Sequence, residues 1–289
     1  MAHFDNYIFD SQFLFLNEQQ KLREAYEKLV SKSITENLGL KACIITESWD
    51  SDKFKKKIGR LLWLENNVSS GKLCLNIIEK LKIFDCCYIR LNAEHSFCNY
   101  AEQNNISFQS SKVSQYIDLK EHYFIFDNAI KYIECIDNIE DKEEIIAQVL
   151  TLSENSFIHN RFRADTHFSD DQINDIYRSW VINEIKSKES QLFLITEQGK
   201  VASFFLYREN ISPLAQYKIG FVSLIASSPE FKEKKYASNL LNFVLNKAKT
   251  NKTDYVIANT EKRNINAIYF FSKNNFSVTS HLNEYHIWS

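Results

Sequence analysis

Apolar positions along this chain follow two periods, which together predict its elements. In the first half, continuous or alternating apolar runs predict strands at 12–16, 42–45, 58–64, 86–91, 113–119 and 122–126. Apolar residues at three- and four-residue spacing predict helices at 18–30, 73–81 and 94–103. Residues 49–54 are expected to form a loop or a helix start. Strands and helices therefore alternate along the first half.

The second half repeats this alternation. Helical spacing is found at 145–150, 170–187, 237–248 and 264–274, and strands are expected at 192–196, 201–207, 217–226, 255–258, 276–278 and 285–288. The segment 197–200 reads as the turn of a hairpin, and residues 160–169 as a charged loop. The order indicates an α/β (α+β) fold. An acidic segment with few large apolar residues, 136–142, is the best linker, which gives two domains, 1–138 and 139–289.

One stretch of the second half carries a chemical signal. An apolar strand ends at Ser228-Pro229, a short loop with Lys232, Lys234 and Lys235 follows, and a helix then starts near Tyr236 and Ala237. The first amides of a helix have no partner inside it, and the helix dipole favours an anion in front of them. The loop therefore indicates a phosphate site, although a solvated helix start would show the same lysines.

Composition narrows the class of protein. The 289 residues are 44% hydrophobic and 25% charged, and the net charge of −2 gives no global attraction to nucleic acid or membranes. The N-terminal residues resemble no signal peptide and no run is long enough for a membrane helix, so we expect a cytoplasmic protein. The six cysteines are all in the first half and show no zinc spacing. We expect buried free thiols and no bound metal.

Two motifs resemble the Gcn5-related N-acetyltransferase family. The segment Ser227–Ala237 lies over its main motif, roughly Val-x-Pro-Glu-Tyr-Arg-Gly-x-Gly-x-Ala. A later motif of the family is matched by a second group of residues: Asn264, Ala267, Ile268, Lys273 and Phe276. The resemblance implies two acetyltransferase-like domains, each a mixed, mostly antiparallel sheet flanked by helices. Only the second would have a loop for coenzyme A.

A narrower resemblance extends over both halves. The segment Asn160–Asp165, with Tyr177, Trp180 and Asn183-Glu184, is similar to the start of the catalytic domain in dTDP-fucosamine acetyltransferases. Trp49–Asp52 and Ile58-Gly59-Arg60 resemble the opening of their first domain. These enzymes acylate the amine of a dTDP-linked amino-dideoxy sugar from acyl-CoA, so the resemblance implies those two substrates, a role in surface glycan (lipopolysaccharide or O-antigen) biosynthesis, and a homodimer.

The resemblance assigns cofactor-binding positions. It implies that the strand residues pair with pantetheine, that the basic loop and helix start hold the pyrophosphate, and that the later helix lies beside the thiol: Leu224, Ile225, Ala226, Ser227, Lys232, Lys234, Lys235, Tyr236, Ala237, Asn264 and Phe271. The sequence departs from the family at Glu233 and Lys235, which replace glycines, and at Phe271, where many relatives have a tyrosine proton donor.

Acyl transfer to an amine also needs a proton donor for the leaving thiolate and a neutral amine. Tyr285 or a water is expected to supply the proton. His167, with Asp165 and Glu184 as further candidates, is expected to serve as the base, although a polar surface loop would also hold such a histidine.

The acceptor is expected to lie against the loop before the 170–187 helix. Arg161 and Arg163 suit a diphosphate, and Phe162, Phe168 and Tyr177 could stack on sugar or thymine. Salt bridges and core packing are the alternatives for these residues. Three functions stay open: a sugar-nucleotide N-acyltransferase using acetyl or a hydroxyacyl group such as 3-hydroxybutyryl on a 3- or 4-amine, a protein or peptide N-acetyltransferase, and a non-catalytic module of the same fold.

Overall fold

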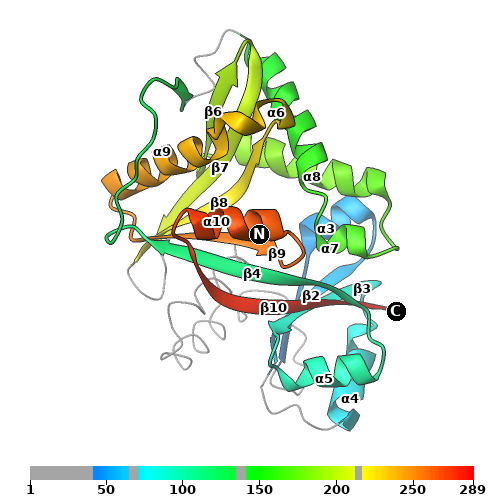
Figure 1. The fold of residues 1–289 in the computed structure, drawn as a ribbon. Coiled ribbons are helices and arrows are strands. Elements are labelled where there is room, and N and C mark those ends of the chain that lie inside the picture. The colour runs from blue at the N-terminus through cyan, green and yellow to red at the C-terminus, as the bar shows by residue number, and fades with distance from the viewer. Residues whose placement is uncertain (1–41, 65–70, 135–140, 212–216) are drawn as a thin grey trace.

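A computed structural model describes residues 42–64, 71–134, 141–211 and 217–289. Their strands form one ten-stranded sheet in the order β1-β2-β3-β10-β4-β9-β8-β7-β6-β5, with helices packed along it (Figure 1). Neighbouring strands are antiparallel except in the pairs β2–β3 and β8–β9. The predicted mixed, mostly antiparallel sheet flanked by helices is confirmed, and the strands of both halves share a single sheet.

The elements of the first half agree closely with the apolar pattern. They are β1 (Ala42–Thr46), α3 (Ser48–Phe54), β2 (Ile58–Leu64), α4 (Gly71–Leu81), β3 (Cys86–Asn92), α5 (Ser96–Gln103), β4 (Phe108–Asp118) and β5 (Tyr132–Ile133). The strand predicted at 122–126 is not formed, since those residues lie in irregular chain between β4 and β5. The strand at 12–16 and the helix at 18–30 lie outside the described residues.

The second half begins with helices and ends with one long strand. Its elements are α6 (Lys142–Ser156), α7 (Arg161–Ala164), α8 (Asp170–Lys186), β6 (Ser190–Glu197), β7 (Lys200–Ile211), β8 (Lys218–Ser227), η2 (Pro229–Lys234), α9 (Tyr236–Thr250), β9 (Tyr255–Glu261), α10 (Ile265–Lys273) and β10 (Ser277–Trp288). The two closing strands predicted at 276–278 and 285–288 are both part of β10. Most of the predicted linker, including the boundary at 138, falls outside the described residues.

The two halves exchange strands at the centre of the sheet. Strand β10, from the second half, pairs with β3 and β4, both from the first half. Strand β4 in turn pairs with β9 of the second half. The order β3-β10-β4-β9 therefore interlaces the halves, and the hydrogen bonds of the central strands cross between them.

Apolar side chains cover both faces of this sheet. Helix α9 buries Leu240, Leu241, Val244, Leu245 and Ala248 at the spacing predicted from the sequence. A separate cluster joins the halves, with Phe54 and Tyr88 of the first half packed against Phe162, Phe168 and Ile176 of the second. The cysteines at 74, 86, 87 and 98 are buried free thiols, as expected for these four.

Candidate functional site

Strands β8 and β9 part from each other in the second half. Their parallel pairing runs from Ile219–Tyr255 to Val222–Ala258 and stops there. Beyond that point β8 continues to Ser227 along β7, and β9 continues to Glu261 along β4. The edge of β8 that faces β9 thus has backbone groups beyond Val222 with no partner in β9. An extended polar ligand can pair with such an edge, and Leu224 to Ser227 lie on it.

Helix α9 begins directly after the basic loop. Its N-cap, Lys235, gives no side-chain hydrogen bond to the first amides, which therefore lie open toward the loop. Lys235 has a φ of 55°, in the left-handed region where glycine is favoured. The loop keeps the backbone shape that a glycine would give, although the residue is a lysine. An anion can therefore approach the start of α9, including Tyr236 and Ala237.

The lysines of this loop differ in their contacts. Lys234 lies 3.4 Å from Glu197, and that carboxylate also accepts a hydrogen bond from the Tyr236 hydroxyl. Lys232 and Lys235 are exposed and form no ion pair within the described ranges. The loop therefore has two uncompensated positive charges beside open helix amides, an arrangement that suits a diphosphate.

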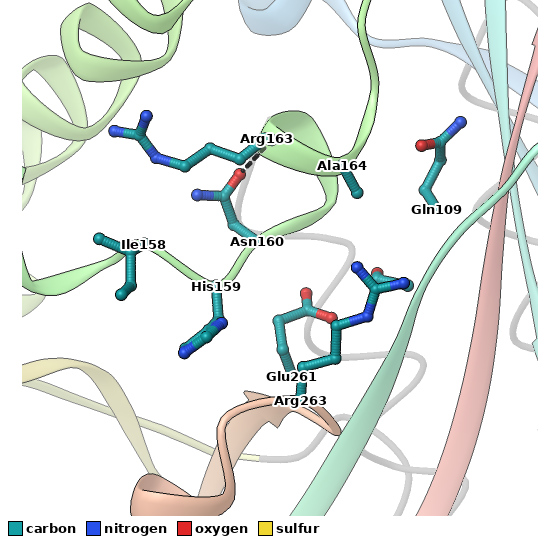
Figure 2. Close-up of a pocket in the computed structure, with 9 residues that line it drawn as sticks. Gln109, Ile158, His159, Asn160, Arg163, Ala164, Glu261 and Arg263 are labelled. Carbon is teal, nitrogen blue, oxygen red and sulfur yellow. Dashed lines mark hydrogen bonds between the residues drawn. The ribbon is translucent and has the colours of Figure 1, made fainter.

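A cavity of about 100 Å³ lies at the end of β9 (Figure 2). It is lined by residues from β4, from the chain around α7 and from the end of β9: Gln109, Ser110, Ile158, His159, Asn160, Arg163, Ala164, Glu261 and Arg263. Figure 2 shows Glu261 and Arg263 side by side, with the Arg163 guanidinium pointing away from them. Arg163 instead contacts Asp170 and Asn174 of α8, and so ties the rim of the cavity to that helix.

Glu261 has the properties of a general base. Burial raises the pKa of its carboxyl to about 7, with a further contribution from the negative charge of Glu284, while Ser110, Arg90 and Arg161 act in the opposite direction. Its Oε2 atom is buried, and the contribution of Ser110 is a hydrogen bond between the serine hydroxyl and this carboxyl. A carboxylate with a pKa near neutral pH can accept a proton during turnover.

Arg161 does not line the cavity. It is buried and forms ion pairs with Asp50 of α3 and Glu284 of β10, and Glu284 also pairs with Arg90 of β3 at 3.0 Å. Its guanidinium lies over the rings of Tyr88 and Phe162. These ion pairs hold the pKa of Glu284 well below its usual range. The diphosphate contact expected for Arg161 thus finds no support, because both carboxylates already bind the guanidinium inside the protein.

His167 lies on the surface beside a buried carboxylate. Its Nδ1 is 2.8 Å from Asp165, and its ring stacks on Trp288 at 4.2 Å. Asp165 is also hydrogen-bonded by His286 and by the Trp288 indole, and these bonds lower its pKa despite burial. His167 is therefore fixed against the C-terminal end of β10, outside the lining of the cavity.

The expected aromatic contacts are mostly core residues. Phe162 and Phe168 are 8% and 6% exposed and pack with Phe54, so neither face is free for a base or a sugar. Tyr177 stacks on Phe157, and burial raises the pKa of its hydroxyl, with a further contribution from the negative charge of Glu261. The Tyr177 hydroxyl therefore lies within electrostatic reach of the carboxylate at the cavity. Glu184 is also buried and binds Trp180 and Ser190.

The remaining expected site residues have structural contacts. Tyr285 is 4% exposed in the core of the first half, between the rings of Phe97 and Phe108. This position gives its hydroxyl no access to the parting of β8 and β9. Phe271 is buried in the core under α9, and Asn264 caps α10 by accepting a hydrogen bond from the Ala267 amide.

Sequence reasoning missed Glu261 and Arg263. The available signal was their position, since they follow the predicted strand 255–258 directly and precede the Asn264 motif. What marks Glu261 as a base is its burial next to Glu284, which comes from a different part of the chain.

Two other kinds of function find no support in the described part of the chain. No grouping of three or more His, Cys, Asp or Glu side chains there is suited to hold a metal ion. None of the helices described combines the length and the apolar character that crossing a bilayer requires.

Comparisons with known proteins agree with this geometry. Residues 153–276 match the model of the acetyltransferase (GNAT) family. Over 265 residues the chain is 24% identical to "Spore coat polysaccharide biosynthesis protein SpsD" of Bacillus subtilis (strain 168), an alignment covering 89% of this chain and 88% of that protein.

The fold is similar to solved structures over most of its length. A functionally unknown conserved protein from Staphylococcus epidermidis ATCC 12228 superposes with a TM-score of 0.62 at 10% identity, covering 89% of this chain and 94% of that one. A tandem GNAT protein from the clavulanic acid biosynthesis pathway gives a TM-score of 0.51 at 10% identity, covering 79% and 74%. Such low identities show a shared fold.

Proposed function

We propose that this chain, whose residues 153–276 match the model of the acetyltransferase (GNAT) family, is a sugar-nucleotide N-acyltransferase that uses acetyl-CoA or another acyl-CoA. It transfers an acyl group from acyl-CoA to the amine of a dTDP-linked 3- or 4-amino-dideoxy hexose, for surface glycan biosynthesis. The observation that carries the proposal is Glu261, a half-buried carboxylate with a pKa near 7 in the cavity at the end of β9.

Coenzyme A is proposed to bind along β8 and in front of α9. The open edge from Leu224 to Ser227 pairs with the pantetheine amides, and the start of α9 with Lys232 and Lys235 binds the pyrophosphate. Backbone donors fixed in place before the reaction stabilise the developing oxyanion, which is often a large catalytic term. The acyl group is acetyl or a short hydroxyacyl such as 3-hydroxybutyryl.

The acceptor is proposed to enter the cavity with its amine at Glu261. The amine attacks the thioester carbonyl, the C–N bond forms, and the amine proton moves to Glu261 as the C–S bond breaks. Coenzyme A leaves as a thiolate and is protonated by water, because no tyrosine hydroxyl lies at Phe271. The exposed Arg263 guanidinium, on the rim of the cavity, contacts the sugar's diphosphate.

Support for a sugar acceptor comes from the relative in spore coat polysaccharide biosynthesis, which aligns with both halves. The cavity also combines a base, a cation and amide side chains, which fits a charged acceptor with hydroxyl groups. A cytoplasmic homodimer remains part of the proposal.

A CoA-release assay tests this function. Purified protein is given acetyl-CoA or 3-hydroxybutyryl-CoA with dTDP-linked 3- or 4-amino sugars, the free amino sugars, or a lysine peptide. We expect release with the nucleotide sugars only, with kcat/KM rising as the pH passes about 7 because Glu261 must be ionised.

Two pairs of variants sharpen the assay. Glu261→Gln is expected to lower kcat by about 10²–10⁴-fold and to abolish the rise of kcat/KM near pH 7. Glu154→Gln, on the surface, is expected to change neither kcat nor this pH dependence. Arg263→Ala is expected to raise the KM for the nucleotide sugar but not for a free amino sugar, whereas the exposed neighbour Lys262→Ala leaves it unchanged. The proposal would be contradicted if the lysine peptide were the one acceptor that is acylated, or if none of the acceptors were acylated.

A further inference from the structure

The cavity of the second half is completed by the first half. Gln109 and Ser110 belong to β4, whereas its other lining residues come from the chain after 157. The strand exchange makes this possible, because β4 lies directly beside β9 and pairs with it up to Lys112–Glu261.

The backbone of β4 is irregular where it reaches the cavity. On β10, Glu284 pairs with Ser110 and the next residue, Tyr285, pairs with Phe108, so Gln109 is an extra residue in β4. This is a β-bulge, which bends a strand and changes the direction of its side chains. Successive residues of a regular strand point to opposite faces, yet Gln109 and Ser110 both line the cavity.

The bulge places a buried hydroxyl beside Glu261. Ser110 is 4% exposed, and a hydrogen bond from its hydroxyl acts to lower the pKa of the Glu261 carboxyl. A serine hydroxyl that donates its one hydrogen keeps two lone pairs that can accept hydrogen bonds. Because both residues line the cavity, the Ser110 oxygen and the Glu261 carboxylate can both accept hydrogen bonds from one ligand group.

We propose that Ser110 is an acceptor-binding residue, whose hydroxyl holds the reacting amine against Glu261. This inference rests on the proposed function. Ser110 Oγ accepts one N–H of the neutral amine, and this hydrogen stays on the nitrogen in the amide product. The other N–H faces Glu261 and gives its proton to that carboxylate as the C–N bond forms and the C–S bond breaks. The nitrogen lone pair is thereby directed at the thioester carbonyl.

The assignment gives the first half a role in substrate specificity. Binding of coenzyme A uses β8 and α9, which are remote in sequence from Ser110, so loss of the hydroxyl affects the acceptor and not the cofactor. A matched control is present on the same strand. Ser114 is equally buried, but its hydroxyl is bonded to Asn259 at 2.6 Å and does not line the cavity.

The experiment compares these serines by steady-state kinetics with the best acceptor and by calorimetric binding of coenzyme A. Ser110→Ala is expected to lower kcat/KM for the acceptor about 3- to 10-fold, the loss of one neutral hydrogen bond, at unchanged affinity for coenzyme A. Ser110→Thr, which keeps the hydroxyl, is expected to stay within about 3-fold of wild type, as is Ser114→Ala.

The outcomes separate the two claims. The role of Ser110 is overturned if the wild-type protein is active and Ser110→Ala has an unchanged kcat/KM for the acceptor. It is also overturned if Ser114→Ala loses as much kcat/KM as Ser110→Ala. Either result leaves the proposed function standing. If none of the acceptors tested causes the wild-type protein to release coenzyme A, the proposed function fails, and the assignment of Ser110 fails with it.

Discussion

Gly59 of β2 and Gly220 of β8 occupy equivalent positions in the two parallel strand pairs found among the described residues. Each follows the isoleucine with which the parallel pairing begins, and each is paired with the second residue of the next parallel strand, Cys87 or Val256. Each also lies against an aromatic side chain, Phe84 or Tyr207. The strand–helix–strand units β2–α4–β3 and β8–α9–β9 thus repeat one arrangement, although the sequence shows no obvious repeat.

Gly220 is expected to tolerate no side chain. A Cβ atom there would lie 2.1 Å from the Tyr207 hydroxyl, whose ring is 3% exposed in the core. Gly220→Ala should therefore cost about 1–3 kcal/mol of unfolding free energy in urea titrations, as overpacking does. Gly71→Ala is the control, because its nearest contact is an ordinary 3.5 Å to Tyr100. Equal stabilities of the two variants would contradict this reading.

Arg161 should prove to be a stability residue. Its removal leaves Asp50 buried without its arginine partner and leaves Glu284 paired with Arg90 alone, so Arg161→Ala is expected to cost about 3–5 kcal/mol of unfolding free energy. Arg178→Ala breaks a largely exposed pair with Glu154 and should change stability by about 0.5 kcal/mol or less. Chemical denaturation measures the unfolding free energy of both variants. If Arg161→Ala were as stable as wild type but had a raised KM for the acceptor, Arg161 would instead contact the substrate, as the sequence led us to expect.

The left-handed N-cap of α9 predicts a gain from glycine. Lys235 holds a φ of 55°, which costs a lysine about 1 kcal/mol and a glycine almost nothing, so Lys235→Gly should raise the unfolding free energy by up to that amount. Lys232 lies in η2 without a positive φ, and Lys232→Gly should lower it by about 0.5–1 kcal/mol. We expect the unfolding free energy to change in opposite directions in the two variants, as measured by urea denaturation. A lower unfolding free energy in both variants would contradict the prediction.

Glu261 predicts a pH dependence of stability. Its pKa is about 7 in the folded protein and 4.5 ordinarily, so the folded state favours the protonated form. The stability that this form contributes is complete below pH 4.5 and is lost as the pH rises through 7. Glu261→Gln does not titrate, so its stability relative to wild type should rise by about 1–3 kcal/mol between pH 4.5 and 8. A constant difference between the two proteins across that range would show that the carboxyl is not perturbed.

Local patterns predicted local structure well. The strand at 58–64 and the buried stripe of α9 follow from periods of two and 3.6 residues, which depend on near neighbours only. The pairing of β10 with β3 depends on residues that are far apart in sequence, and no periodicity specifies it. The sequence therefore predicted two separate sheets where the chain forms one.

The candidate site was predicted in part for the same reason. The loop before Tyr236 and the helix start are local features, and they lie together in the structure. Arg161 and Phe162 matched a motif, but their burial depends on α3 and β10, which the motif does not contain. The properties of Glu261 arise from contacts across three strands, so its residue type alone gave no indication.

The interlacing of β4 and β10 also constrains how the chain can fold during translation. Among the described strands β10 leaves the ribosome after all the others, and until then β3 and β4 have unpaired edges where β10 will lie. The nascent first half thus cannot complete its sheet on its own, unlike a chain whose domains mature one after another. Cutting the gene between the halves should yield two fragments that remain aggregation-prone apart and recover a native sheet only when co-expressed.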